Sequence, residues 1–414
     1  MPRTLKIYWE RRLVGELIQE EGRLAFRYDE DYRSLAGVLP LSRRLPLGDE
    51  GFGHEATEAF FANLLPEGAI RRQVARQFGV SAENTFSLLE AIGGDCAGAV
   101  SVLAPGDRPG ADGNYRPISA EDLARELDSL PAHPFLAGEE GVRLSLAGAQ
   151  NKLPVFIENG AYYIPEGNLP SSHILKTAIE RLEDTVTNEA FCMNLAQRVG
   201  LPAPEARVVE IAGKRVYLVE RYDRHKASGG STERLHQEDF CQALGIPPEL
   251  KYEKEGGPGF ADCFSLVGAW SVEPVLDSLS LLRWAFFNFM IGNADAHAKN
   301  LSFLYRAGGV RLAPFYDLLS TAVYERVNNK FAMKMGGQKD PRYLMADDLA
   351  RFAKEAGVGL RAVKGQLKEL CEKITEHITP LAQTYRATCG NPPIVEEILR
   401  VVDRRIRKAR TLAS

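Results

Sequence analysis

One stretch of the sequence, residues 279–317, constrains the fold more than any other. Residues 279–291 are apolar on almost every side, which predicts a helix that is buried on several faces. The helical pattern ends at Gly292, and a loop rich in small residues follows. Residues 301–305 and 310–313 then have the pattern of a β-hairpin. A buried helix that leads through a polar loop into a hairpin indicates an α+β protein.

Two acids and one amide occupy fixed places along this stretch. Asp295 lies five residues before Asn300, and Asp317 follows the hairpin. Protein kinases use the same layout: the first acid accepts the proton of the attacking hydroxyl, while the amide and the second acid bind Mg²⁺ beside the ATP phosphates. Mg²⁺ prefers oxygen ligands and keeps several waters, so one amide and one carboxylate suffice. A solvated loop with a chance Asp-x4-Asn is the alternative, and the hairpin and second acid favour phosphoryl transfer over it.

A kinase also needs a segment that covers the phosphates, and residues 144–152 have a suitable composition. Their sequence, Leu-Ser-Leu-Ala-Gly-Ala-Gln-Asn-Lys, would let backbone N–H groups approach an anion. It is neither Gly-x-Gly-x-x-Gly nor a Walker A motif, and a plain surface turn is the alternative. Lys176 lies 28 residues after Gly148, a gap like that between a kinase phosphate loop and its ATP-pairing lysine. Glu189, 13 residues further on, could pair with Lys176, and the alternative for it is a solvated helix face.

Residues 217–224, an apolar strand that passes into a charged turn, stand where a kinase has the hinge that holds adenine. Tyr222 could stack on a purine or contact its edge. The alternative is that Arg221, Asp223 and Arg224 form a surface ion-pair cluster, which would contribute little energy. The sequence pattern leaves both interpretations open.

Composition excludes several other classes of protein. The 414 residues include 51 Lys+Arg and 55 Asp+Glu, a balance that argues against dominant binding to the DNA backbone. The longest runs without a charge, such as Trp284–Ala294, have 11 residues and are too short for a membrane span. The six cysteines form no Cys-x-x-Cys pair and the histidines no His-Glu-x-x-His, so neither a disulfide framework nor a zinc site is indicated. We therefore expect a soluble, cytoplasmic protein.

Local patterns predict further elements. Residues 5–9 and 24–28 alternate like strands, and hairpins are expected about Asn159-Gly160 and Ala212-Gly213. Amphipathic or capped helices are expected over 58–65, 69–78, 184–199, 346–356, 360–377 and 395–412.

Proline, glycine and charge concentrate in residues 104–117, which we interpret as a surface linker before a helix capped by Ser119. We therefore expect an N-terminal subdomain over 1–105, the rest of an N-terminal lobe over 119–220, and a helical C-terminal lobe over 221–414.

Over essentially its whole length the chain resembles the HipA family of bacterial toxin kinases. The motifs that carry the resemblance are Asn-Leu-Leu-Pro-Glu-Gly at 63–68, Gly-Gly-Asp-Cys-Ala-Gly-Ala-Val at 93–100, the segment 144–152, Ser-His-Ile-Leu-Lys at 172–176, Val-Glu-Arg-Tyr-Asp-Arg at 219–224, Gln-Glu-Asp-Phe-Cys-Gln at 237–242, Lys-Tyr-Glu-Lys-Glu-Gly-Gly-Pro-Gly at 251–259, Ile-Gly-Asn-Ala-Asp-Ala-His-Ala-Lys-Asn at 291–300 and Pro-Phe-Tyr-Asp at 314–317. In one departure from ordinary protein kinases, Leu-Leu-Ser rather than Phe-Gly follows Asp317.

The resemblance implies a two-lobed, kinase-like α+β fold with an added N-terminal β-rich subdomain. It implies a serine/threonine protein kinase that uses ATP and Mg²⁺, with Asp295 as catalytic base, Asn300 and Asp317 as metal ligands, and Ser145 as a site of autophosphorylation. The nucleotide-binding residues that it implies are Ala147, Gly148, Ala149, Gln150, Asn151, Lys152, Lys176, Glu220, Arg221, Tyr222, His297, Asn300 and Tyr316.

The resemblance also implies partners. The best-known members of the family phosphorylate an aminoacyl-tRNA synthetase, which halts translation and promotes drug tolerance. A helix-turn-helix antitoxin, HipB, neutralises them, and operator DNA is bound mainly through that antitoxin. Two other functions stay open: a small-molecule phosphotransferase with the same Asp/Asn/Asp logic, and a non-catalytic, nucleotide-binding corepressor partner of a helix-turn-helix protein.

Overall fold

The computed structural model describes residues 2–110, 113–139, 141–226 and 232–414. The chain forms two compact units. The first comprises residues 1–177, 210–248 and 304–306, and the second comprises residues 178–209, 249–303 and 307–414. Two residues of the predicted linker, 111–112, lie outside the described residues.

The first unit begins with a four-stranded antiparallel sheet of order β3-β2-β1-β4. Its strands are β1 (Arg3–Trp9), β2 (Arg12–Glu20), β3 (Arg23–Tyr28) and β4 (Val100–Leu103). The alternating pattern predicts β1 and β3 correctly but misses β2. The apolar residues of β2 come in the pairs Leu13-Val14 and Leu17-Ile18, a four-residue repeat that resembles a helix rather than a strand.

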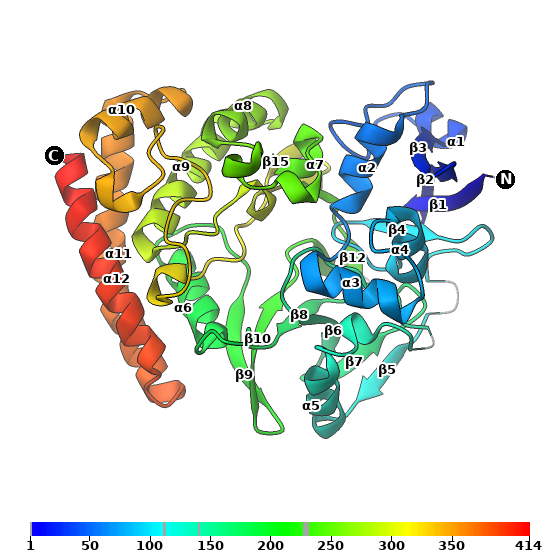
Figure 1. Ribbon diagram of the computed structural model, residues 1–414, viewed down its shortest axis with the longest axis horizontal. Coiled ribbons are helices and arrows are strands. Elements are labelled where there is room, and N and C mark those ends of the chain that lie inside the picture. The colour runs from blue at the N-terminus through cyan, green and yellow to red at the C-terminus, as the bar shows by residue number, and fades with distance from the viewer. Residues whose placement is uncertain (1, 111–112, 140, 227–231) are drawn as a thin grey trace. The chain divides into compact units, whose positions relative to one another are not determined.

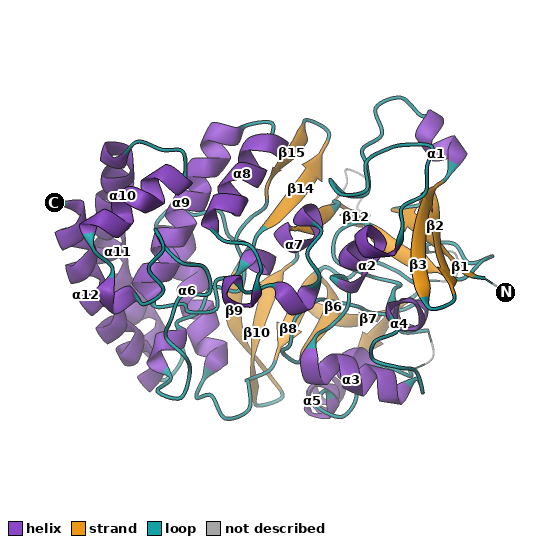
Figure 2. Ribbon diagram, turned by 45° about the horizontal axis from the view of Figure 1, so that its top comes forward, coloured by secondary structure: helices purple, strands orange, loops and turns teal. Residues whose placement is uncertain are grey.

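A six-stranded sheet of order β5-β7-β6-β8-β10-β9 follows (Figure 2). Its strands are β5 (Tyr115–Ile118), β6 (Lys152–Glu158), β7 (Ala161–Pro165), β8 (His173–Lys176), β9 (Ala206–Ile211) and β10 (Lys214–Glu220). Both predicted hairpins are confirmed. Each turns on two residues with positive φ, Asn159-Gly160 and Ala212-Gly213, as a tight hairpin turn requires.

Short helices and strands complete the first unit. The helices are α1 (Glu30–Ser34), α2 (His54–Ala62), α3 (Gly68–Gln77), α4 (Thr85–Ile92), α5 (Ala120–Ser129) and α7 (Phe240–Leu244). The strands are β11 (Arg224–Lys226), β12 (Thr232–Arg234) and β13 (Gln237–Asp239). The predicted cap is confirmed, because the Ser119 hydroxyl accepts a hydrogen bond from the Asp122 N–H at 3.0 Å.

Helices dominate the second unit. They are α6 (Thr185–Arg198), α8 (Phe260–Trp270), α9 (Pro274–Ile291), α10 (Ala346–Glu355), α11 (Leu360–Thr388) and α12 (Pro393–Ala413). The hairpin after α9 is confirmed as β14 (Ser302–Arg306) and β15 (Gly309–Leu312). Helix α11 runs eleven residues beyond the predicted end at His377.

Helix α9 is the centre of this unit and packs against α8, α11 and α12 (Figure 1). Its aromatic side chains, including Trp284, Phe286 and Phe287, are buried, as the apolar pattern predicts. Among the described residues, no helix has the length and hydrophobicity that crossing a membrane would require.

Candidate active site

Helix α9 ends at Gly292, and this ending positions the predicted catalytic loop. Gly292 has a φ of 72°, the left-handed conformation that glycine adopts at low cost. A Cβ at this position would also lie only 2.7 Å from the Cβ of Ala322 and 2.8 Å from a methyl group of Val401. Glycine is therefore required on two grounds where the chain turns from the buried helix into residues 293–300.

The buried amide of Asn293 organises this loop. Its nitrogen donates hydrogen bonds to the side-chain oxygen of Asn288 at 2.8 Å and to the backbone carbonyl of Asp317 at 3.4 Å. Its oxygen accepts from the backbone N–H of Asp295 at 3.0 Å. One side chain thus ties the predicted catalytic acid and the predicted metal-binding acid to the end of α9. The sequence does not indicate this role of Asn293, because an amide that supports a backbone has no motif of its own.

The predicted metal ligands can offer oxygen atoms. The Asn300 side-chain nitrogen donates to the backbone carbonyl of Asp295 at 3.0 Å, which leaves the amide oxygen as the group available to a cation. Asp317 has a φ of 54°, a strained conformation for a residue with a side chain. An amide oxygen and a carboxylate suit Mg²⁺, whereas no cluster of three His, Cys, Asp or Glu residues among the described residues would suit a transition metal.

The predicted site residues in and near the loop 293–300 differ in how far they are exposed to solvent. Asp295 is exposed, as a base that meets an external hydroxyl must be, whereas His297 and Asn300 are buried. The hydroxyl of Tyr316 donates to the backbone carbonyl of Lys299 at 2.7 Å, so this predicted nucleotide contact also fastens the loop to the segment before Asp317.

Two lysines of the first unit lie directly opposite each other on neighbouring strands. Lys152 on β6 is in register with Lys176 on β8, and both are buried. Two ammonium groups side by side on one face suit the binding of an anion such as a phosphate. The ammonium group of Lys152 donates to the backbone carbonyl of Ala147 at 2.5 Å, and that of Lys176 lies 5.4 Å from the ring centre of Tyr217, the next residue in the same row.

On the same face of the sheet, the residues two positions along each strand from Lys152, Lys176 and Tyr217 form an apolar row. Pro154 on β6, Ile174 on β8 and Val219 on β10 are in register and point to the side of the lysines, because side chains alternate along a strand. This apolar row beside two ammonium groups suits a base attached to phosphates. We did not predict it, because strand register is not visible before the strands are paired.

The predicted phosphate loop is held by two segments of the predicted N-terminal subdomain. The backbone carbonyl of Gly148 accepts from the Glu67 N–H at 3.1 Å, and the Ser145 N–H donates to the Asp95 carbonyl at 3.1 Å. The Ser145 hydroxyl, which is wholly buried, donates to the Leu64 carbonyl at 2.9 Å. The motifs at 63–68 and 93–100 thus act as supports for the loop.

The exposure of the loop changes along its length. Leu144, Ser145 and Leu146 are buried, whereas residues 147–151 are partly or fully exposed. The Gln150 side chain donates to the backbone carbonyl of Thr177 at 2.9 Å, which fastens the loop to the end of β8.

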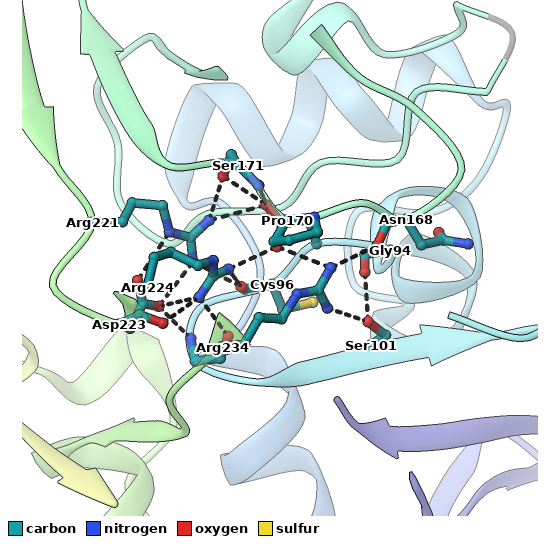
Figure 3. A network of polar contacts seen from close by, with 12 residues as sticks. Gly94, Cys96, Ser101, Asn168, Pro170, Ser171, Arg221, Asp223, Arg224 and Arg234 are labelled. Atoms are coloured by element: carbon teal, nitrogen blue, oxygen red, sulfur yellow. Dashed lines mark hydrogen bonds and ion pairs between the residues drawn. The ribbon is translucent and has the colours of Figure 1, made fainter. Parts of the chain in front are cut away.

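The charged turn after β10 forms an ion-pair cluster (Figure 3). The cluster is buried, so the alternative prediction of an ion-pair cluster is right and its predicted place on the surface is wrong. Arg221 donates to both carboxylate oxygens of Asp223, at 3.0 and 2.9 Å, and to Asp95 at 3.1 Å. Arg224 and Arg234 lie 2.7 and 3.4 Å from the same Asp95 carboxylate. Although burial by itself raises the pKa of Asp95, the three guanidinium groups hold it well below its usual range.

The side chain of Arg221 is therefore committed to the interior of the first unit. Its backbone N–H also donates, to the Ser172 carbonyl at 3.0 Å. Its neighbours are differently placed: Glu220 is exposed, and the Tyr222 hydroxyl donates to the side-chain oxygen of Gln237. Contact of residues 220–222 with a nucleotide stays a prediction. The hydrogen bonds of Arg221 hold this segment in place.

Glu189 lies on α6 and is buried, 3% exposed, so the alternative of a solvated helix face is wrong. Its predicted pairing with Lys176 stays a prediction.

Two family models match the chain: the HipA N-terminal domain over residues 5–103 and the HipA-like C-terminal domain over residues 144–378. The chain is 43% identical over 383 residues to the protein Y4mE of Sinorhizobium fredii, a match that covers 91% of both chains. It is 33% identical over 389 residues to the serine/threonine-protein kinase toxin HipA of Shewanella oneidensis, which covers 91% of this chain and 88% of the toxin.

The fold is also similar to a solved structure. A chain of the Shewanella oneidensis complex of HipA, HipB and operator DNA matches with a TM-score of 0.85 and 30% identity, over 97% of both chains. These matches confirm the α+β fold and the resemblance inferred from the sequence motifs.

Proposed function

The chain belongs to the HipA family of serine/threonine protein kinases, and we propose that it transfers the γ-phosphoryl group of ATP, with Mg²⁺, to a serine or threonine hydroxyl of a protein. The observation that carries the proposal is the link through Asn293, which joins an exposed acid, Asp295, to a second acid, Asp317, at the end of a buried helix. Phosphoryl transfer needs such fixed oxygen groups, because its catalysis is mostly positioning and charge neutralisation.

Each of these groups has one task in the proposal. Asp295 accepts the proton of the attacking hydroxyl on its exposed carboxylate. Asn300 and Asp317 would hold Mg²⁺ through side-chain oxygens, and the cation would offset charge on the transferred group. His297 and Tyr316 belong to the nucleotide-contacting set at this loop.

Residues of the first unit have tasks of their own in the proposal. The backbone of residues 147–151 and the ammonium groups of Lys152 and Lys176 would bind the phosphates. Residues 220–222 would hold the base beside the apolar row of Pro154, Ile174 and Val219. The opposed lysines support this assignment, because their register brings two positively charged side chains to one place on the sheet.

We propose that autophosphorylation at Ser145 switches the enzyme off. A phosphoserine carries about two negative charges at neutral pH. The buried position of Ser145, against the Leu64 carbonyl, has no room for that charge, so a modified loop would have to leave its supports. The loss of this arrangement would remove the predicted phosphate-binding backbone.

The proposed cellular role is that of a toxin in a toxin–antitoxin pair. A HipB-like helix-turn-helix antitoxin would be the partner, with operator DNA bound mainly through it and an aminoacyl-tRNA synthetase as the protein substrate. The similarity over 97% of the chain to a HipA solved with HipB and operator DNA supports the antitoxin. The substrate follows from the family alone.

Labelled ATP tests the proposed activity. The purified chain and its Asp295→Asn variant are each incubated with Mg²⁺ and γ-labelled ATP, once with a bacterial protein extract and once with a protein-free metabolite fraction. We expect label in protein from the wild-type reaction alone. Label in a metabolite but in no protein would indicate a small-molecule phosphotransferase instead. Equal labelling by both variants would contradict the role of Asp295.

A further inference from the structure

A tyrosine from a distant segment contacts the proposed catalytic base. The hydroxyl of Tyr252 donates a hydrogen bond to Oδ1 of Asp295 at 2.7 Å. The two residues are 43 positions apart and belong to the same unit. Asp295 is exposed, so its carboxylate would otherwise rotate in solvent. The phenol thus restrains one of its two oxygens.

The backbone around Tyr252 is held in place by its own segment. The carbonyl of Tyr252 accepts from the N–H groups of Glu255 at 2.9 Å and of Gly257 at 3.0 Å. A Cβ on Gly257 would lie 1.8 Å from the carbonyl oxygen of Leu250, so that the close turn requires glycine. The turn therefore presents the tyrosine from a fixed backbone.

The next residue, Glu253, anchors the segment to another part of the same unit. Its carboxylate accepts from the backbone N–H of Lys334 at 2.5 Å and pairs with the Lys334 ammonium at 3.1 Å. The Tyr252 ring packs edge-on against His297, with 5.1 Å between ring centres and an interplanar angle of 83°. The Glu253 contacts thus hold the backbone next to Tyr252, and the His297 contact holds its ring.

We propose that Tyr252 is a positioning residue for phosphoryl transfer: its hydroxyl fixes the Asp295 carboxylate through Oδ1, so that Oδ2 faces the acceptor hydroxyl. This inference rests on the proposed function. A base must meet its proton within hydrogen-bond reach and in the right orientation, and a small misplacement lowers the rate strongly. The interaction orients the carboxylate and does not itself transfer a proton.

The hydroxyl and the ring of Tyr252 have separable roles. The ring contacts His297 and lies 5.4 and 5.3 Å from the ammonium groups of Lys251 and Lys254. Phenylalanine keeps these ring contacts and loses the hydroxyl group, whereas leucine loses the ring as well as the hydroxyl group. If the ring alone matters, Tyr252→Phe retains the wild-type rate.

The test measures phosphate transfer from γ-labelled ATP into protein, as a function of ATP concentration, together with the affinity for a fluorescent ATP analogue. The variants are Tyr252→Phe, Tyr252→Leu and, as a matched control, Tyr343→Phe, an exposed tyrosine of the same unit. Melting temperatures show that each variant is folded. The Tyr252→Phe change is also made in an Asp295→Asn background.

We expect Tyr252→Phe to lower the maximal rate about 10- to 100-fold while the analogue affinity stays within about twofold, and Tyr343→Phe to match the wild type. In the Asp295→Asn background the second change should have no further effect. A wild-type or higher rate in Tyr252→Phe, or a loss confined to nucleotide affinity, would overturn the inference while leaving the proposed function intact. A wild-type chain with no transfer above Asp295→Asn would instead refute the proposed function, and this inference with it.

Discussion

Asn293 reaches the backbone carbonyl of Asp317, 24 residues later in the chain, with a hydrogen bond of 3.4 Å from its buried side-chain nitrogen. The oxygen of the same amide accepts from the Asp295 N–H, so a single side chain fixes the spacing between two acidic residues. The arrangement depends on the amide having both a donor and an acceptor end.

Replacing Asn293 by Asp tests this link, because aspartate keeps the acceptor oxygen but loses both N–H donors. We expect the free energy of unfolding to fall by about 1–3 kcal/mol, the cost of an unsatisfied buried polar group, and phosphate transfer to fall about 100-fold. Denaturant titration and labelled ATP measure the two effects. Asn328→Asp is the control, because its side-chain oxygen accepts a backbone N–H at an exposed site. Wild-type transfer by Asn293→Asp would contradict the link.

The buried serine of the phosphate loop gives a second prediction. Incubation with ATP and Mg²⁺ should add one phosphate to the wild-type chain, measured by intact-protein mass, and Ser145→Ala should prevent it. The alanine variant should lose only about 1 kcal/mol of stability, the net worth of the hydrogen bond to Leu64.

The chain contains its own control for this experiment. Residues 34–37 repeat the Ser-Leu-Ala-Gly sequence of 145–148, but Ser34 is exposed on α1. Ser34→Ala should leave the added mass unchanged. Unmodified wild-type protein that still phosphorylates a target would refute regulation through Ser145.

The stability of the first unit should depend on pH through two buried side chains, His236 and Glu238, whose titrations have opposite effects. Burial lowers the pKa of His236 from 6.5 to about 4, so between these values only the unfolded chain binds the proton, and stability rises with pH. Burial raises the pKa of Glu238 from 4.5 to about 7, so the folded chain keeps its proton longer, and stability falls as pH rises through that window.

The two effects oppose each other between about pH 4.5 and 6.5, and single variants separate them. In Glu238→Gln only the effect of the histidine is left. As the pH increases, the free energy of unfolding of this variant should rise relative to that of the wild type by up to about 1.4 kcal/mol per pH unit. His236→Gln leaves the carboxyl and should show the opposite slope relative to wild type. Denaturant titrations across this range measure both, and identical slopes in the two variants would contradict the assignment.

The buried carboxylate of Asp95 should contribute far more to the free energy of unfolding than an exposed carboxylate does. Asp95→Asn leaves Arg221 and Arg224 without the charge that they contact at 3.1 and 2.7 Å, and we expect a loss of roughly 3–5 kcal/mol. Asp128→Asn breaks an exposed pair with Lys214 and should cost less than about 1 kcal/mol. Thermal unfolding of both variants compares them, and equal melting temperatures would show that the network contributes no net stability.

Local signals in the sequence predict part of this structure well. The turns at Asn159-Gly160 and Ala212-Gly213 are encoded by the residues that adopt positive φ, and the Ser119 cap depends on neighbours three residues apart. Strand β2 is missed because its paired apolar residues resemble a helical repeat. Local signals thus predict an element correctly unless, as in β2, the local pattern is typical of another kind of element.

The supports of the candidate site are not local, and this is why the sequence does not reveal them. The opposed lysines, Lys152 and Lys176, become a pair only when β6 and β8 are in register. The partners of Asp95 come from the turn after β10 and from β12, so Arg221 and Arg234 look like surface charges until the chain is folded. Such contacts require the tertiary structure.

Protein-kinase activity that depends on Asp295 is tested most directly by a quantitative phosphoproteome of cells that express the wild-type chain or Asp295→Asn at equal levels. We expect a small set of serine or threonine sites to gain phosphate with the wild type alone, at least one of them on a protein of translation. Identical phosphoproteomes in the two strains, with the wild-type protein folded and present, would contradict this activity.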